Sequence, residues 1–126
     1  MENTKVALAL IFSSALLDSL SAYIVKSQFN KLGRINIDSF SNVLTYLITF
    51  FKNPVLLLAL LAFFLAPCLW FFALNKLELS TAYPILVGFH LVFVMIIGLV
   101  LLGEQVTPSK IFASILIGLS VWILYK

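Results

Sequence analysis

The chain has 126 residues, of which 63% are hydrophobic and only 10% are charged. A soluble domain of this size cannot bury so much apolar surface, because small folds leave a large fraction of their surface exposed. The formal net charge of +3 is spread along the chain without a basic run, which argues against nucleic-acid binding. These properties predict an integral membrane protein without a soluble domain.

Four apolar stretches are long enough, or nearly so, to cross about 30 Å of hydrocarbon as helices. They cover residues 6–25, 54–74, 82–102 and about 108–125. The first resembles a secretory signal in part, but Asp18 interrupts its apolar run, so we expect it to be retained as a span. The prediction is one all-α domain, a bundle of four transmembrane helices.

Capping residues mark the ends of these helices. Asn53-Pro54 and Thr107-Pro108 each place a capping side chain before a proline at the first helical position. Gly103 follows the third span, where helices commonly end. The turns on either side of the third span are short, so consecutive spans there are expected to be antiparallel neighbours.

The link between the first two spans is longer and contains residues 38–52, "DSFSNVLTYLITFFK". Its apolar residues recur at helical spacing, with serine, asparagine and threonine on the other side. This pattern predicts a short amphipathic helix, either lying in the membrane interface or capping the bundle. Basic residues gather on the same side of the predicted bundle, which weakly favours that side as cytoplasmic. They are Lys26, Lys31, Arg34, Lys52 and Lys110, against Lys5, Lys76 and Lys126 on the other side.

Asp18 is the main candidate for function, because it lies only about 4–5 Å from the middle of the first span at 1.5 Å per residue. Its helical neighbours include Ser14 and Ser21, which make this face small and polar, suited to a helix contact or a wet cavity rather than lipid. Acids inside a membrane are usually parts of ion or substrate paths, so we predict that Asp18 binds a proton or a substrate. The alternative is a protonated side chain that only bonds two helices together.

Other residues extend this candidate site. His90 lies at similar depth on the parallel third span, where it either bonds to Asp18 or, more commonly for a buried histidine, to a backbone carbonyl. Tyr83 opens the third span and Trp70 lies on the second; both are candidates for the substrate site, or for interface anchoring and packing. Lys26 is about 12 Å from Asp18 along the helix, so we expect it to reach the headgroups, and we expect Glu104 to be solvated.

The fourth span has a surface of small residues that predicts close helix packing between subunits. These residues are Ala113, Ser114, Gly118 and Ser120. One histidine, one cysteine and no glycine-rich phosphate loop leave no constellation for a catalytic nucleophile, metal or cofactor. The chain is therefore not expected to be an enzyme.

At this point the chain resembles the small multidrug resistance family, four-helix members of the drug/metabolite transporter superfamily. The resemblance rests on an acid followed eight residues later by lysine in "DSLSAYIVK", an Ala-Tyr motif in "STAYPILVG", a "GEQ" ending of span three and the small face of span four. It covers all four spans but not residues 35–51. It implies an antiparallel dimer in a bacterial or archaeal inner membrane, with Asp18 and Tyr83 in a shared substrate site.

The departures from that family concern the proposed site. The family acid is glutamate, a tryptophan is replaced by Leu86, and His90 occupies a glycine position. The subunits that flip undecaprenyl-phosphate aminoarabinose are also similar, through "LWFFALNKLELSTAYPIL" and the turn at Glu104, although they generally lack the membrane acid.

Three functions remain open from the sequence. The leading one is proton-coupled export of small cationic or amphiphilic compounds by a homodimer, or by a heterodimer with a similar subunit. The second is a subunit of a flippase for lipid-linked sugars. The third is a membrane subunit that does not transport and only packs against a partner. The expected partners are membrane lipid and a small-molecule or lipid-linked substrate, not nucleic acid.

Overall fold

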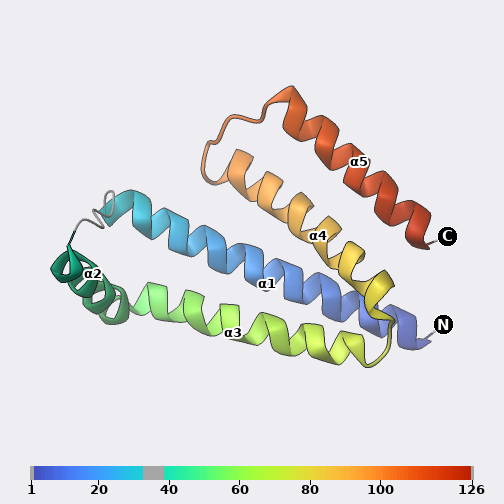
Figure 1. Cartoon of the computed structure of the whole chain (residues 1–126), viewed down its shortest axis with the longest axis horizontal. Helices are drawn as coiled ribbons and strands as arrows, with labels where there is room; N and C mark the ends of the chain where they lie inside the picture. The colour runs from blue at the N-terminus through green and yellow to red at the C-terminus, as the bar shows by residue number, and fades with distance from the viewer. Residues whose placement is uncertain (1, 33–38, 126) are drawn as a thin grey trace.

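The computed structural model describes residues 2–32 and 39–125, and the secondary structure within them is entirely helical. In these residues five helices follow one another, α1 (Glu2–Leu32), α2 (Phe40–Lys52), α3 (Pro54–Leu74), α4 (Leu79–Val100) and α5 (Pro108–Tyr125). Figure 1 shows α1 and α4 running in one direction and α3 and α5 in the other, with both ends of the chain at the same end of the bundle. The prediction of an all-α fold is confirmed.

Three of the described helices, α1, α3 and α4, are long and apolar enough to cross a membrane. They correspond to the first three predicted spans, although α1 is longer than its span at both ends and α4 begins three residues early. α5 has 18 residues, a length of about 27 Å at 1.5 Å per residue. It is apolar but shorter than the three candidate spans. The fourth span therefore stays a prediction. The chain is an integral membrane protein.

The longest helix contact joins α1 to α3 along most of their lengths. Three buried alanines of α3 meet α1 at intervals of seven residues: Ala59, Ala66 and Ala73. α3 is hydrophobic on all sides, so only the small size of these side chains marks its packed face. Where lipid is as apolar as the core, close approach of small residues holds helices together.

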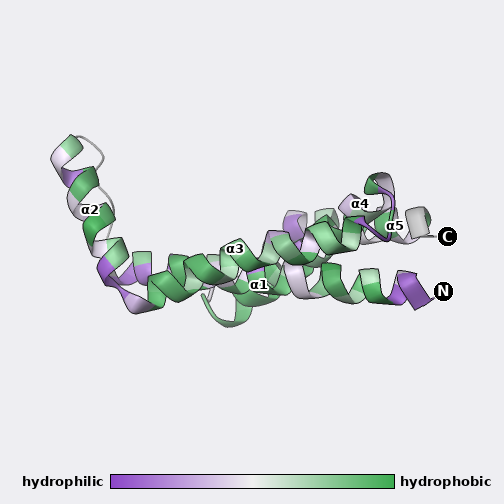
Figure 2. Ribbon diagram, turned by 90° about the horizontal axis from the view of Figure 1, so that it is seen from below, coloured by the Kyte–Doolittle hydropathy of each residue, from purple (hydrophilic) through white to green (hydrophobic). Residues whose placement is uncertain are grey.

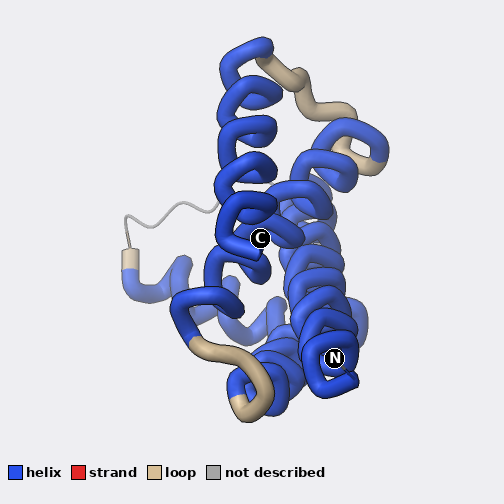
Figure 3. Tube along the Cα trace, turned by 90° about the vertical axis from the view of Figure 1, so that its right-hand side faces the viewer, coloured by secondary structure: helices blue, strands red, loops and turns tan. Residues whose placement is uncertain are grey.

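α4 packs against the other side of α1, and α5 packs only against α4 among the described elements. Figure 3, which looks along the helices from the end with both termini, shows α5 at the edge of the bundle. α4 and α5 pack closely at Gly88, where an added Cβ atom would lie 3.0 Å from Cγ2 of Val121. The outer faces of α3, α4 and α5 expose large apolar side chains, as expected for contact with lipid.

Asn53 and Gly103 lie at helix ends as expected, although the bounds of α1 and α4 differ from the predicted spans. The side chain of Asn53 accepts a hydrogen bond from the amide of Val55 at 3.0 Å, and α3 starts at Pro54. Gly103 has φ of +64°, a left-handed conformation that glycine adopts at little cost. This reversal brings the amide of Glu104 to within 2.8 Å of the carbonyl of Gly98, and so places the Glu104 side chain beside the end of α4.

α2 confirms that a helix lies between the first two spans, and it has no buried residues. Figure 2 shows α2 turned away from the line of α1 and α3. Its apolar residues remain exposed, with Phe40 at 83%. Arg34, Asp38 and Lys126, which entered the sequence predictions, lie outside the described residues.

Candidate functional site

A cavity of about 160 Å³ lies where α1, α3 and α4 meet, and it contains the acid of the first span. Its polar side chains are Ser14 and Asp18 from α1 and His90 from α4. α3 contributes Trp70 and Pro67 to the wall. Four residues that the sequence predicts for proton or substrate binding, Ser14, Asp18, Trp70 and His90, therefore line one cavity.

The acid and the imidazole face each other in this cavity. His90 Nε2 and Asp18 Oδ2 are 3.1 Å apart, an ion-pair distance if the ring is protonated. The approach lacks the alignment of a hydrogen bond, so the buried Nε2 atom has no hydrogen-bond partner among the described residues. Buried polar atoms are usually satisfied. An unsatisfied ring nitrogen beside a carboxylate is therefore placed to bind a proton, a water molecule or a ligand.

The two predicted serines mainly join helices. The Ser14 hydroxyl donates to the carbonyl of Ala66 at 2.7 Å, and the Ser21 hydroxyl donates to that of Ala59 at 2.6 Å. Both serines are almost fully buried between α1 and α3. Ser14 also lines the cavity, whereas Ser21 does not. Ser21 is thus brought to the helix interface and not to the candidate site.

The aromatic residues form one side of the site. The rings of Trp70 and Tyr83 meet edge to face, with centroids 6.1 Å apart and an angle of 68° between their planes. Tyr83 does not line the cavity and is 57% exposed. Tyr83 therefore contacts the cavity wall only through the ring of Trp70.

A second acid–base contact between α1 and the end of α4 was not foreseen. The Lys26 ammonium donates to Oε1 of Glu104, so Glu104 is not merely solvated as expected. Both side chains remain partly exposed, at 54% and 39%. The sequence does place Lys26 and Glu104 at the same end of the bundle, because spans one and three run parallel.

Two lysines determine the charge state of Glu104, which lies outside the membrane-spanning helices. The hydrogen bond from Lys26, and then its charge, lower the pKa of the Glu104 carboxyl below its ordinary value. Slight desolvation opposes this shift, and the charge of Lys110 adds a smaller lowering of the pKa. Glu104 is therefore a carboxylate at neutral pH.

The small residues predicted for subunit packing lie in different surroundings. Ala113 and Ser114 line a groove between α4 and α5. A Cβ atom at Gly118 would meet nothing within 4 Å, and the Ser120 hydroxyl donates back to the carbonyl of Leu116. Gly118 and Ser120 are therefore the small residues that remain open for contact with another copy of the chain.

No cluster of three potential metal ligands occurs among the described residues. No curated protein and no solved structure matches the chain. The model of the EamA-like transporter family matches residues 3–126, nearly the whole chain. This match confirms the resemblance to the drug/metabolite transporter superfamily and identifies a transporter family rather than a family of enzymes. The chain belongs to the EamA-like transporter family.

Proposed function

We propose that the chain is a proton-coupled exporter of small cationic or amphiphilic compounds that works as a dimer. The observation that carries the proposal is Asp18, 3.1 Å from His90 in a cavity between three helices. An isolated carboxylate at this depth costs several kcal/mol, so it needs a positive partner or a proton. Its neutralisation is the event that couples proton and substrate.

Three species compete for the carboxylate: a proton, the His90 imidazolium and a cationic substrate. Each neutralises Asp18, so binding of one displaces the others. A substrate that enters from one side releases a proton, and a proton that enters from the other side releases the substrate. No charged side chain of α3 lines the cavity, so the exchange involves only α1 and α4.

The cavity wall favours a compound that combines positive charge with apolar surface. Apart from its three polar side chains, the wall is formed by Ala66, Pro67, Trp70 and Leu86. The face of an indole ring attracts cations, by about 0.5–2 kcal/mol depending on desolvation. Tyr83 supports the orientation of Trp70 by its edge-to-face contact. This wall suits an organic cation better than a hydrated metal ion.

The size of the cavity supports a dimer. Its volume of about 160 Å³ is below the roughly 300–1,000 Å³ of pockets that enclose drug-sized ligands. A second copy that placed its own cavity opposite would complete the enclosure, with α5 as the fourth span and its open small residues, Gly118 and Ser120, in the contact. The resemblance to the small multidrug resistance family implies an antiparallel pair, and a heterodimer with a similar subunit meets the same need.

We place α2 in the membrane interface rather than over the bundle. Most of its apolar face is exposed, although Tyr46 contacts Phe29 of α1, and Figure 2 shows the helix pointing away from the others. The hydroxyls of Thr45 and Thr49 bond back to carbonyls one turn earlier, which leaves its polar face compact. An amphipathic helix of this kind buries its apolar face among lipid headgroups and acyl chains.

The second candidate is a subunit of a flippase for lipid-linked sugars. The described lysines at one end of the bundle, Lys26, Lys31, Lys52 and Lys110, favour it because they attract phosphate headgroups. Under this function, deletion of the gene removes a surface glycan and leaves drug tolerance unchanged. The exporter predicts the opposite pattern.

The test is pH-driven uptake of radiolabelled tetraphenylphosphonium into proteoliposomes. We expect Asp18→Asn to reduce the initial rate about 100-fold, because the cation loses its charged partner. Glu104→Gln is the matched control, since it neutralises an acid outside the cavity, and it retains most of the rate. Circular dichroism and gel filtration establish that both variants fold. Unchanged uptake by Asp18→Asn would defeat the proposal and would favour a subunit that does not transport.

A further inference from the structure

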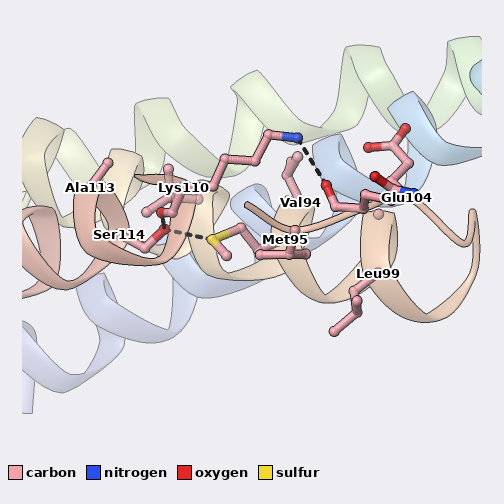
Figure 4. A pocket seen from close by; sticks show the side chains of 11 residues that line it. Val94, Met95, Leu99, Glu104, Lys110, Ala113 and Ser114 are labelled. Atoms are coloured by element: carbon pink, nitrogen blue, oxygen red, sulfur yellow. Dashed lines mark hydrogen bonds between the residues drawn. The ribbon is translucent and has the colours of Figure 1, made fainter. Parts of the chain in front are cut away.

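A second cavity, larger than the one at Asp18, lies apart from it between α4 and α5. A groove of about 260 Å³ runs between α4 and α5 and is lined mainly by apolar side chains. Figure 4 shows Val94, Met95 and Leu99 on one wall and Ala113 and Ser114 on the other. The Ser114 hydroxyl contacts the Met95 sulfur and the carbonyl of Lys110, so its polar group is already bonded and the groove floor is effectively apolar.

The mouth of the groove is charged. Glu104 and Lys110 lie there, and Lys110 Nζ donates to the carbonyl of Gln105 at 3.3 Å (Figure 4). Because Lys26 neutralises Glu104, the second ammonium leaves the mouth with a net positive charge. α5 also begins here at Pro108, and the N-terminal end of a helix carries a partial positive charge.

The same charge sign extends over this end of the molecule. Among the described residues four lysines gather here, Lys26, Lys31, Lys52 and Lys110, and Glu104 is the only acid. At the opposite end the described lysines Lys5 and Lys76 are balanced by Glu2 and Glu78. A phosphate group that approaches the bundle is therefore attracted to one end, the end at which the groove opens.

We propose that the α4–α5 groove binds one acyl chain of an anionic phospholipid, with its phosphate at Lys110. The groove extends from the mouth to Leu91, eight residues before Leu99, hence about 12 Å along α4. That is most of one leaflet of a hydrocarbon core about 30 Å thick. The apolar lining and the length of the groove match an acyl chain, and the positively charged mouth matches the phosphate of the same lipid.

A helix of a second copy would insert only side chains into the groove, and an apolar helix face would leave the positive mouth without a negative partner. A free phosphate has no use for the apolar depth, and a zwitterionic lipid lacks the net negative charge that the mouth selects. The inference is independent of the proposed transport function, because it concerns helices and charges outside the Asp18 cavity.

Native mass spectrometry of the full-length chain in detergent tests this site. The probes are phosphatidylglycerol, phosphatidylcholine with the same acyl chains, and glycerol 3-phosphate. We expect phosphatidylglycerol to be retained about tenfold more tightly than phosphatidylcholine and glycerol 3-phosphate not to bind. Lys110→Gln lowers phosphatidylglycerol affinity about fivefold, while Lys76→Gln, the same change at the balanced end, leaves it unchanged.

A second pair of variants tests the apolar depth. Ala113→Phe fills the groove and lowers retention of both phospholipids, whereas Ile115→Phe adds the same ring to α5 outside the groove and has no effect. Equal retention of the two phospholipids, or equal effects of Lys110→Gln and Lys76→Gln, would overturn the proposal. So would tight binding of glycerol 3-phosphate, or an Ala113→Phe variant that splits a dimer while its lipid binding is unchanged.

Discussion

Two acid–base contacts join α1 to the α4 region, and they differ in depth and surroundings. Asp18 and His90 face each other across a cavity midway along α1 and α4, without an aligned hydrogen bond. Lys26 and Glu104 are hydrogen-bonded at the end of the helices, with both side chains partly exposed. The Asp18–His90 contact lacks a hydrogen bond in surroundings where a charged group is strongly destabilised. The Lys26–Glu104 contact is hydrogen-bonded at the surface, where water stabilises charged groups. Function is therefore expected from the first and a modest structural role from the second.

We expect the largest effect from a substitution in the wall of the Asp18 cavity. Ala66 is 2% exposed, lines the Asp18 cavity and accepts a hydrogen bond from Ser14. Ala66→Leu forces extra methylenes into the α1–α3 interface and should destabilise the chain by about 1–3 kcal/mol. The same substitution fills the cavity, so binding of tetraphenylphosphonium is lost as well. Thermal unfolding and equilibrium binding in detergent measure the two effects.

The matched control for Ala66→Leu is Gly118→Leu on α5. A side chain there enters open space, since nothing lies within 4 Å of the Cβ position. Its unfolding midpoint in monomeric detergent preparations should equal or exceed that of the wild type, because glycine is a poor helix former. If both variants unfolded at the same temperature, the tight α1–α3 contact would not be the main support of the cavity.

His90→Gln tests whether the imidazole competes with the substrate. An imidazolium at His90 beside Asp18 neutralises the acid from within the chain, whereas the amide of a glutamine there carries no charge. Lowering the pH should therefore weaken cation binding to the wild type about tenfold more than to His90→Gln. The ionisable groups facing the contact are Asp18 and His90 alone among the residues that line the cavity.

Isothermal titration at a series of pH values gives this comparison directly. Glutamine keeps a polar side chain of similar reach, so a loss of folding is not expected to obscure the result. Parallel pH profiles for the wild type and His90→Gln would mean that Asp18 alone accounts for proton competition. His90 would then be a wall residue of the cavity.

Much of the fold follows from the sequence, because the bilayer limits the choices. Long apolar runs, Asn53-Pro54 and Gly103 predict helices and their ends, and the parallel course of spans one and three places His90 near Asp18 in depth. The parallel course of the same spans puts Lys26 and Glu104 at one end of the bundle, but their contact also depends on a turn that brings a loop acid back over Gly98. Ser21 was placed in the site because helical spacing locates a face, but does not tell which neighbouring helix that face meets.

Glu104→Gln completes the comparison with the smallest expected effect. The pKa of Glu104 is lowered in the folded chain, so its contact with Lys26 stabilises the fold fully above the ordinary value of 4.5. As the pH falls through the lowered pKa, the carboxylate takes up a proton and the contribution is lost. At pH 7 the variant should unfold about 2 °C below the wild type, as expected for an exposed pair. The difference should shrink as the pH is lowered below 4.5, and 0.5 M salt should narrow the difference at pH 7 because exposed charges are screened. A difference that stayed constant as the pH was lowered would mean that the Glu104 side chain acts by packing over Gly98 rather than by its charge.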